Sequence, residues 1–527
     1  MRQLLCLFSG LFSGLPFFLG VAVAQSNVVV PKPTFHTEVG AFLTTSPQMP
    51  FWMRANQYGI VPLKGPIGTV QVGLEAGYTS ESADSVVRFR AKSPLEIGYG
   101  LEVVGNGGQA NQIILPEAYV KARYRNIEIR AGRWRNVIGI TDTLLTSGSY
   151  VWSGNALPIP RIQIGTRGFV TLPFAKKWLT VNAFFGHGWF GKDNYVQGYY
   201  LHQKGIYARV GKPNWRVKLQ GGFSHQVQWG GYAPFLKGTT LSKNGYLPEG
   251  LDAYFSIVSA SRYVQSASTS IFDEENRIGN HLGSFDGAFD IDLGQYKMLV
   301  YRQFLYETGS LYYLTSVKDG LNGISLQRLY PGKSFVTVDR FLFEFFYSGN
   351  QGGDNFVIND PQLRGRVNYF NHAQYRGGWT YKNRTIGSPF LTQGIEQRRS
   401  LDITEGLPVI NNRVMAFHFG LAGTMAQRMN WSAKASFTTN YGTFQKPYAR
   451  SVSQLSGILS LTTPVHLPIL GETTINGAVA FDTGQLLDNT TGMFLSLRKT
   501  IGRAEAAQPG QSERARPNSF NRYNPRY

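Results

Sequence analysis

Residues 215–224 read Trp-Arg-Val-Lys-Leu-Gln-Gly-Gly-Phe-Ser, and their side chains alternate in polarity. Trp215, Val217, Leu219 and Phe223 fall on one face of an extended strand, while the residues between them fall on the other. A period of two over about ten residues is typical of a strand in a membrane barrel. The stretch therefore predicts a strand with one apolar face and one polar face.

The same alternation recurs along most of the chain, for example at 87–92 (Val-Arg-Phe-Arg-Ala-Lys) and 431–438 (Trp-Ser-Ala-Lys-Ala-Ser-Phe-Thr). A soluble sandwich or propeller would also alternate, but no fixed repeat of about 40–50 residues appears, as a propeller requires. Aromatic residues at strand ends suit the girdles of a barrel; they include Trp134, Trp178, Trp189, Trp215 and Trp229. We therefore predict an all-β fold, a large antiparallel transmembrane β-barrel of about 16–18 strands. A soluble all-β protein is the alternative.

The N-terminus has the features of a secretory signal peptide over residues 1–24. Arg2 precedes an apolar run from Leu4 to Leu19, and Ala22-Val23-Ala24 forms a cleavage site. The only cysteine, Cys6, lies inside this segment, so the mature chain is expected to have no disulfide and no cysteine nucleophile. Export without a spanning helix and with many strands places the protein in the outer membrane of a Gram-negative bacterium.

The rest of the chain is divided by composition. Residues 25–68 are rich in proline and are interpreted as an irregular lead-in with the first strands, and residues 69–502 as the barrel with its extracellular loops. Residues 503–527 form a polar tail that is expected to be disordered. Long segments rich in Gly, Asn, Ser and Pro, such as 348–364 and 387–408, are expected to be extracellular loops.

The formal net charge is +20. In the alternating segments the cations lie opposite the apolar face, so they are expected to line the lumen and to attract anions. These residues are Arg88, Arg90, Lys92, Lys121, Arg123, Arg130, Arg209, Arg216 and Lys218. The alternative is that they pair with lumenal carboxylates and simply solvate the interior. Nucleic acid is not an expected partner, because no binding motif appears.

No catalytic arrangement emerges from the sequence, and the protein is predicted to be neither an enzyme nor a metalloprotein. The eight histidines contain no His-x-x-x-His pair, and no Gly-x-Ser-x-Gly elbow occurs. His187, His202 and His225 could meet across neighbouring strands and bind a metal, although hydrogen bonding is the preferred interpretation. Asp286, Asp290 and Asp292 are a weaker calcium candidate, because calcium requires six or more oxygens. No cofactor is expected.

Three stretches resemble the capsule assembly Wzi family in its Bacteroidetes form. The first is Pro50-Phe-Trp-Met-Arg-Ala-Asn-Gln-Tyr-Gly-Ile-Val-Pro62. The second begins at Ser153-Gly-Asn-Ala-Leu-Pro-Ile-Pro160 and continues through 186–191, 200–204 and 225–231. The third is Tyr369-Phe-Asn-His-Ala-Gln-Tyr-Arg-Gly-Gly-Trp-Thr-Tyr381, followed by Arg384-Thr-Ile-Gly-Ser-Pro389. The ordered blocks span most of residues 35–500.

The resemblance implies an outer-membrane lectin that binds exported capsular polysaccharide or exopolysaccharide and helps attach and organise it at the cell surface. Aromatic rings stack on sugars, and Arg, Gln, Asn and His bond hydroxyls and carboxylates. The candidate polysaccharide-binding residues are Trp189, His202, Gln203, Lys204, His225, Gln228, Trp229, Arg376, Trp379, Tyr381 and Arg384. Interfacial anchoring is the alternative role for each of them.

An anion-selective porin or solute channel is the competing function. Inward-folded loops that plug the lumen would favour the lectin, whereas an open pore with a charged constriction would favour the channel. The expected partners are polysaccharide, with acidic polymers among the candidates, and the lipid and lipopolysaccharide of the outer membrane. The capsule export machinery is a further candidate.

Overall fold

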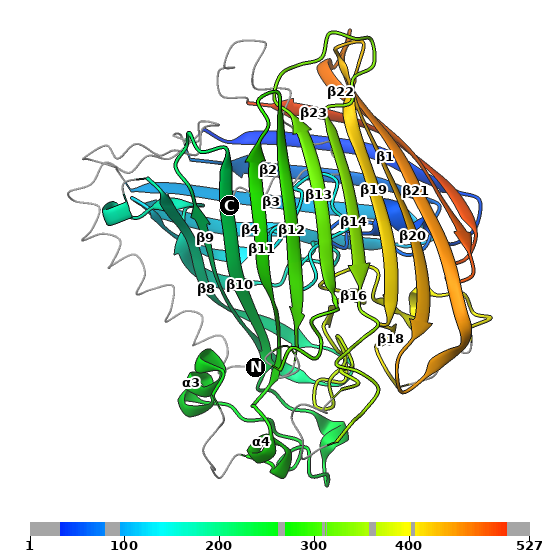
Figure 1. Ribbon diagram of the computed structural model, residues 1–527. Coiled ribbons are helices and arrows are strands. Elements are labelled where there is room, and N and C mark those ends of the chain that lie inside the picture. Colours follow the sequence, from blue (N-terminus) through cyan, green and yellow to red (C-terminus); the bar gives the residue numbers. More distant parts are fainter. Residues whose placement is uncertain are drawn as a thin grey trace, which may run out of the picture.

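The computed structural model describes residues 32–78, 95–175, 177–261, 269–307, 311, 313–357, 365–401 and 406–502. Its main feature is one closed antiparallel sheet (Figure 1). The expected signal peptide (1–24) and polar tail (503–527) lie outside the described residues, as do Arg88, Arg90 and Lys92.

The strands of the closed sheet follow one another around the barrel in chain order. The first nine are β1 (Thr34–Thr44), β2 (Ile67–Ala76), β3 (Glu96–Gly108), β4 (Gln112–Tyr124), β5 (Ile127–Arg133), β6 (Arg161–Thr166), β7 (Val170–Thr171), β8 (Leu179–Lys192) and β9 (Gln197–Val210). The others are β10 (Val217–Trp229), β11 (Asn280–Asp292), β12 (Tyr296–Tyr306), β13 (Gly320–Arg328), β14 (Arg340–Tyr347), β19 (Val414–Met425), β20 (Met429–Gly442), β21 (Pro447–Leu467), β22 (Gly471–Gly484) and β23 (Thr490–Ile501).

Because β6 and β7 succeed each other along the same neighbour, β8, they count as one interrupted strand, and the barrel has 18 strands. The first strand, β1, pairs with the last, β23, and this pairing closes the cylinder. The prediction of a large antiparallel β-barrel with 16–18 strands is therefore confirmed. The barrel includes β1, which lies in the segment interpreted as an irregular lead-in.

The two faces of each strand have different chemistry, as the quoted stretch predicts. Val217 and Leu219 in β10 are each 47 % exposed on the outer wall, where lipid would cover them. Lys218 and Gln220 alternate with them and face the lumen, as does the buried Asp290 that pairs with Lys218 across the sheet. Apolar side chains face the lipid and polar side chains face the lumen, and this arrangement explains the alternation seen in the sequence.

The two ends of the barrel also differ. The start of β1, the end of β23 and several short turns, such as 125–126, 293–295 and 426–428, lie at one end. The long connections lie at the other end and comprise residues 45–66, 134–160, 230–279 and 348–413. Outer-membrane barrels place short turns in the periplasm and long loops outside the cell, so the long-loop end is the extracellular end.

The long connections carry the small elements of the fold. These are α2 (Phe51–Arg54), η2 (Pro234–Leu236), α3 (Leu251–Ser259), α4 (Ile271–Glu275), β15 (Thr380–Tyr381), β16 (Arg384–Thr385), β17 (Thr392–Gln393), η3 (Gly394–Glu396) and β18 (Val409–Asn411). One further turn, η1 (Pro173–Ala175), lies at the periplasmic end. Among the described residues, no helix has the length and apolar character that a membrane span requires.

Candidate functional site

Three of the long connections fold into the lumen. We call the described residues of 45–66, 134–160 and 365–413 the plug. Lumenal side chains of the wall accept hydrogen bonds from its backbone, which would otherwise be buried without partners. These bonds run from Phe51 N to Asp482 Oδ2 (2.8 Å), Ile140 N to Asp286 Oδ2 (2.6 Å), Ser147 N to Glu344 Oε2 (2.7 Å) and Tyr150 N to Gln303 Oε1 (3.0 Å).

A buried ion triad joins two of the plug segments. Glu396 accepts a hydrogen bond from Arg54 Nη1, and Arg384 Nη1 lies 3.8 Å from the same carboxylate oxygen. All three side chains are less than 10 % exposed. Burial lowers the pKa of Arg384 to about 9, and the neighbouring Arg54 acts in the same direction. One carboxylate therefore balances two guanidinium groups in a water-poor interior.

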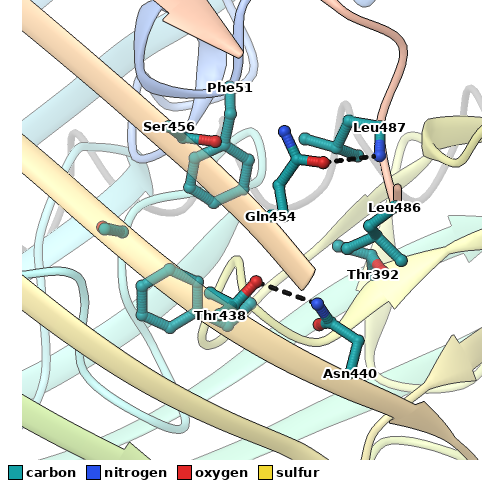
Figure 2. Close-up of a pocket in the computed structure, with 10 residues that line it drawn as sticks. Phe51, Thr392, Thr438, Asn440, Gln454, Ser456, Leu486 and Leu487 are labelled. Atoms are coloured by element: carbon teal, nitrogen blue, oxygen red, sulfur yellow. Dashed lines mark hydrogen bonds between the residues drawn. The ribbon is translucent and has the colours of Figure 1, made fainter. Parts of the chain in front are cut away.

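The plug packs closely against the wall. Figure 2 shows Phe51 facing the polar side chains of β20 and β21, where Asn440 bonds Thr438 and Gln454 bonds the backbone of Leu487. The pocket at this contact has a volume of only about 10 Å³, close to the minimum that one water needs. The plug leaves little free space at this contact.

Two carboxylates at the extracellular rim meet the plug through tyrosine hydroxyls. Tyr150 and Phe370 N donate to Glu307, and Tyr369 donates to Asp319 Oδ2 at 2.7 Å. Burial raises the pKa of Glu307 to about 8, although both of its hydrogen bonds act in the opposite direction. Burial also raises the pKa of Asp319 to about 6. Both groups therefore favour the protonated form when the plug is seated.

These shifts predict that the plug loosens as pH rises. The pKa of Glu307 is higher with the plug seated than its ordinary value of 4.5, so its stabilisation is complete below about pH 4.5 and is lost as pH rises to about 8. We expect a loss of a few kcal/mol at most. Hydrogen exchange of plug amides between pH 5 and 8.5 would measure it. Glu307→Gln should flatten the pH dependence, and an unchanged dependence would contradict this assignment.

Five of the predicted binding residues lie on the outer wall. Trp189, His202, Lys204, His225 and Trp229 share the face of β8–β10 that points away from the lumen. Helix α3 covers this area, because Ala253 and Ile257 pack on Val227 and Trp229. His202, His225 and Trp229 are buried beneath it, Lys204 donates to the carbonyl of Val258, and Trp189 remains 41 % exposed.

The other six predicted binding residues lie inside the barrel or in the plug. Gln203 and Gln228 are buried on the lumenal face, and Gln228 Nε2 donates to Gly378 O at 3.0 Å. Arg376, Trp379, Tyr381 and Arg384 belong to the third plug segment, but only Arg376 is exposed. The structure thus divides the predicted set between an outer-wall group, a lumenal group and one exposed arginine.

The predicted basic lining has a mixed placement. Lys121, Arg123, Arg130, Arg209 and Lys218 are on lumen-facing strand positions. Arg123 pairs with Glu96, and Arg130 Nη2 lies 2.8 Å from Glu128 Oε1. These two ion pairs agree with the alternative interpretation, in which the cations pair with lumenal carboxylates. Arg216 lies instead in the exposed turn before β10, because the strand starts one residue later.

The two candidate metal groups are held by other contacts. His225 Nε2 and His281 Nδ1 are 2.9 Å apart, and His281 Nε2 contacts Ile278 O at 2.7 Å. Asp286 accepts from the plug at Ile140. Within the part of the chain that the structure describes, no three His, Cys, Asp or Glu side chains are arranged to hold a metal ion.

Sequence reasoning missed a group of exposed and half-buried aromatic and cationic residues on the extracellular loops. We call it the loop cluster, and its members are Tyr195, Tyr232, Phe235, Lys237, Tyr246 and Arg376. The Tyr232 and Tyr246 rings are 4.7 Å apart, and Lys237 Nζ lies 5.8 Å from the Tyr232 ring. Arg376 lies 5.8 Å from the rings of both Tyr195 and Phe235. Four of these residues come from the connection 230–279, but Tyr195 and Arg376 come from distant segments, so only the high aromatic content hinted at the cluster.

The geometry of the loop cluster suits a polar ligand with flat apolar faces. Tyr246 is 62 % exposed, and Lys237 and Arg376 are also exposed. An aromatic ring and two cations are therefore accessible from the outside of the cell. Ring faces stack on the C–H faces of sugars, and guanidinium and ammonium groups bond hydroxyls or carboxylates. The cluster can therefore bind a polymer chain without any covalent chemistry.

Comparisons with known proteins agree with this architecture. The solved structure of Wzi, described as an outer-membrane carbohydrate-binding β-barrel involved in group 1 capsule assembly in Escherichia coli, matches with a TM-score of 0.54 and 14 % identity, covering 89 % of this chain and 85 % of that one. An anion-selective porin from Comamonas acidovorans matches with a TM-score of 0.34 and 9 % identity, covering 90 % of this chain and 99 % of that one. OpdQ from Pseudomonas aeruginosa matches with a TM-score of 0.40 and 8 % identity, covering 89 % of this chain and 98 % of that one.

No curated protein matches the chain. The model of the family described as capsule assembly protein Wzi, however, matches residues 39–398, which is more than half of the sequence and includes the first two plug segments and residues 365–398 of the third. The 18-stranded barrel has the fold of an outer-membrane protein, in agreement with the predicted location. The chain therefore belongs to the capsule assembly protein Wzi family of the Gram-negative outer membrane.

Proposed function

We propose that this protein is a non-catalytic lectin that binds exported capsular polysaccharide or exopolysaccharide and anchors it at the cell surface. The observation that carries the proposal is the loop cluster, in which the exposed Tyr246 ring, three half-buried rings and two exposed cations lie together at the extracellular end. The filled lumen supports binding over conduction, because the plug segments occupy the space that an open channel needs.

The proposed binding surface differs from the set predicted from sequence. Arg376 belongs to both sets, whereas Tyr381 is buried and its hydroxyl accepts a hydrogen bond from Arg133 Nη2 at 3.1 Å. The buried His202, His225 and Trp229 offer no surface to a polymer and are not included. The cations Lys237 and Arg376 favour a polymer that carries carboxylates.

A triple variant tests this proposal. Tyr232→Ala, Tyr246→Ala and Arg376→Ala together should weaken binding of the purified protein to the cell's own polysaccharide about tenfold or more, because aromatic and Arg anchors dominate such surfaces. On cells, total polymer should stay constant while a larger share is shed into the medium. Retained and shed polysaccharide would be quantified against the parent strain.

A matched control lies at the periplasmic end. Tyr330→Ala, Phe335→Ala and Arg428→Ala remove the same kinds of side chain there, where Tyr330 is 64 % and Phe335 70 % exposed. This control should leave binding and retention unchanged. Parent-like retention in the loop-cluster variant, with a folded barrel, would refute the proposal.

A further inference from the structure

The lipid-facing wall of β11–β14 contains a groove of about 280 Å³. Its sides are Phe289, Val300, Ile324, Phe343 and Phe345, which all point away from the lumen on neighbouring strands. Gly287 forms part of the floor, because a side chain added there would meet nothing within 4 Å. The groove is therefore a mainly apolar depression in a surface that lipid covers.

Arg302 lies on the same outer face, directly opposite Gly287 on β11 and Asn322 on β13. Its Nη1 donates to Asn322 Oδ1 at 2.6 Å, its Nη2 donates to Val317 O at 2.5 Å, and its guanidinium carbon lies 4.5 Å from the Phe304 ring centre. These hydrogen-bond partners are neutral, as is the more distant backbone carbonyl of Asp319 at 3.5 Å, and the carboxylate of Asp319 acts on the guanidinium only through its electric field. In the described part of the chain, Nε has no hydrogen-bond partner and the ion pairs include none to this guanidinium.

The position of Arg302 along the barrel is defined by Val317. That residue belongs to the connection 307–319, which lies at the extracellular end, so the guanidinium reaches toward the outer boundary of the membrane. A cation on the lipid face of a barrel costs free energy that rises toward the bilayer centre. Charged groups at such positions mark functional sites with a specific partner.

We propose that this groove binds a phosphorylated glycolipid of the outer leaflet, the lipid component of lipopolysaccharide. One acyl chain lies between Phe289, Ile324 and Phe343, and a phosphate group at the boundary bonds Arg302. Arg and phosphate match in charge and in paired hydrogen-bond geometry, and the apolar walls match the chain. The site is independent of the loop cluster and of the polysaccharide proposed to bind there.

Native mass spectrometry of the full-length protein in detergent tests the site, with diphosphorylated lipid A as the probe. Arg302→Gln should weaken the apparent affinity about tenfold, the range expected for losing charge-assisted hydrogen bonds. Gly287→Leu should weaken it as well by filling the groove while leaving Arg302 in place. Removing the phosphates from the probe should weaken binding to the parent protein but change little for Arg302→Gln.

Matched substitutions elsewhere provide the controls. Gly477→Leu adds the same side chain at an open outward position on β22, and Arg428→Gln removes one positive charge at the periplasmic end. Both should bind the probe like the parent protein. If Arg302→Gln and Gly287→Leu bind like the parent, or if the controls weaken binding equally, the proposal is overturned. If Arg302→Gln fails to fold, Gly287→Leu and the dephosphorylated probe still decide the outcome.

Discussion

Glu396→Gln is expected to unseat the plug and to raise ion conductance through the barrel. The substitution keeps the volume of the side chain but removes the negative charge that balances Arg54 and Arg384, both of which are 4 % exposed. Leaving buried cations without a counter-charge typically costs about 3–5 kcal/mol. Because the triad joins the first and third plug segments, both should lose protection together.

Planar-bilayer recordings and hydrogen exchange would measure this effect. The parent should show low conductance, and Glu396→Gln should show larger and noisier openings with faster exchange in residues 45–66. Asp488→Asn is the matched control, because Asp488 forms an exposed pair with Arg398 at 3.7 Å, which should contribute little. Equal behaviour of the two variants would show that the triad does not hold the plug.

Trp379→Ala is expected to have a similarly large effect through packing. Trp379 is fully buried, its Nε1 donates to Val151 O at 2.8 Å, and its ring contacts those of Trp152 and Phe190. Truncating a buried aromatic residue to alanine costs about 3–5 kcal/mol. The second and third plug segments should therefore separate more easily.

Urea unfolding in lipid vesicles, with limited proteolysis of the plug, would measure the change. Trp178→Ala is a suitable control, since Trp178 is 39 % exposed near the periplasmic turn and has lost less surface on folding. If Trp379→Ala resists protease as well as Trp178→Ala does, the packing of this ring does not stabilise the plug. If a variant with an unseated plug still binds polysaccharide, binding by the loop cluster does not depend on a seated plug.

The alternation of polarity predicted the barrel and the faces of its strands, because lipid and lumen impose opposite chemistry on neighbouring side chains. Val217 and Lys218 illustrate this, as one lies outside and the other inside. Of the stretches that carry the family resemblance, 50–62, 153–160 and 369–389 lie in the plug, whereas 186–191, 200–204 and most of 225–231 lie in the wall strands β8, β9 and β10. Their joint folding inward could not be inferred from any one of them.

The binding residues were harder to predict, for a physical reason. Trp229 and Tyr232 lie three residues apart, yet the first packs beneath α3 on the outer wall and the second belongs to the exposed loop cluster. Both suit a sugar by composition alone. Only the end of β10 and the path of the following loop separate the two roles, and strand ends are poorly defined by sequence patterns.

The seam between β1 and β23 determines the order in which the molecule can be assembled. Glu38 and Arg498, whose side chains meet at 3.1 Å across it, are 460 residues apart, so this contact waits for the end of the chain. Until then two strand edges expose backbone groups that lipid cannot solvate. Assembly of the cylinder therefore ends with the pairing of β1 and β23, and until that step both edges need hydrogen-bond partners other than lipid.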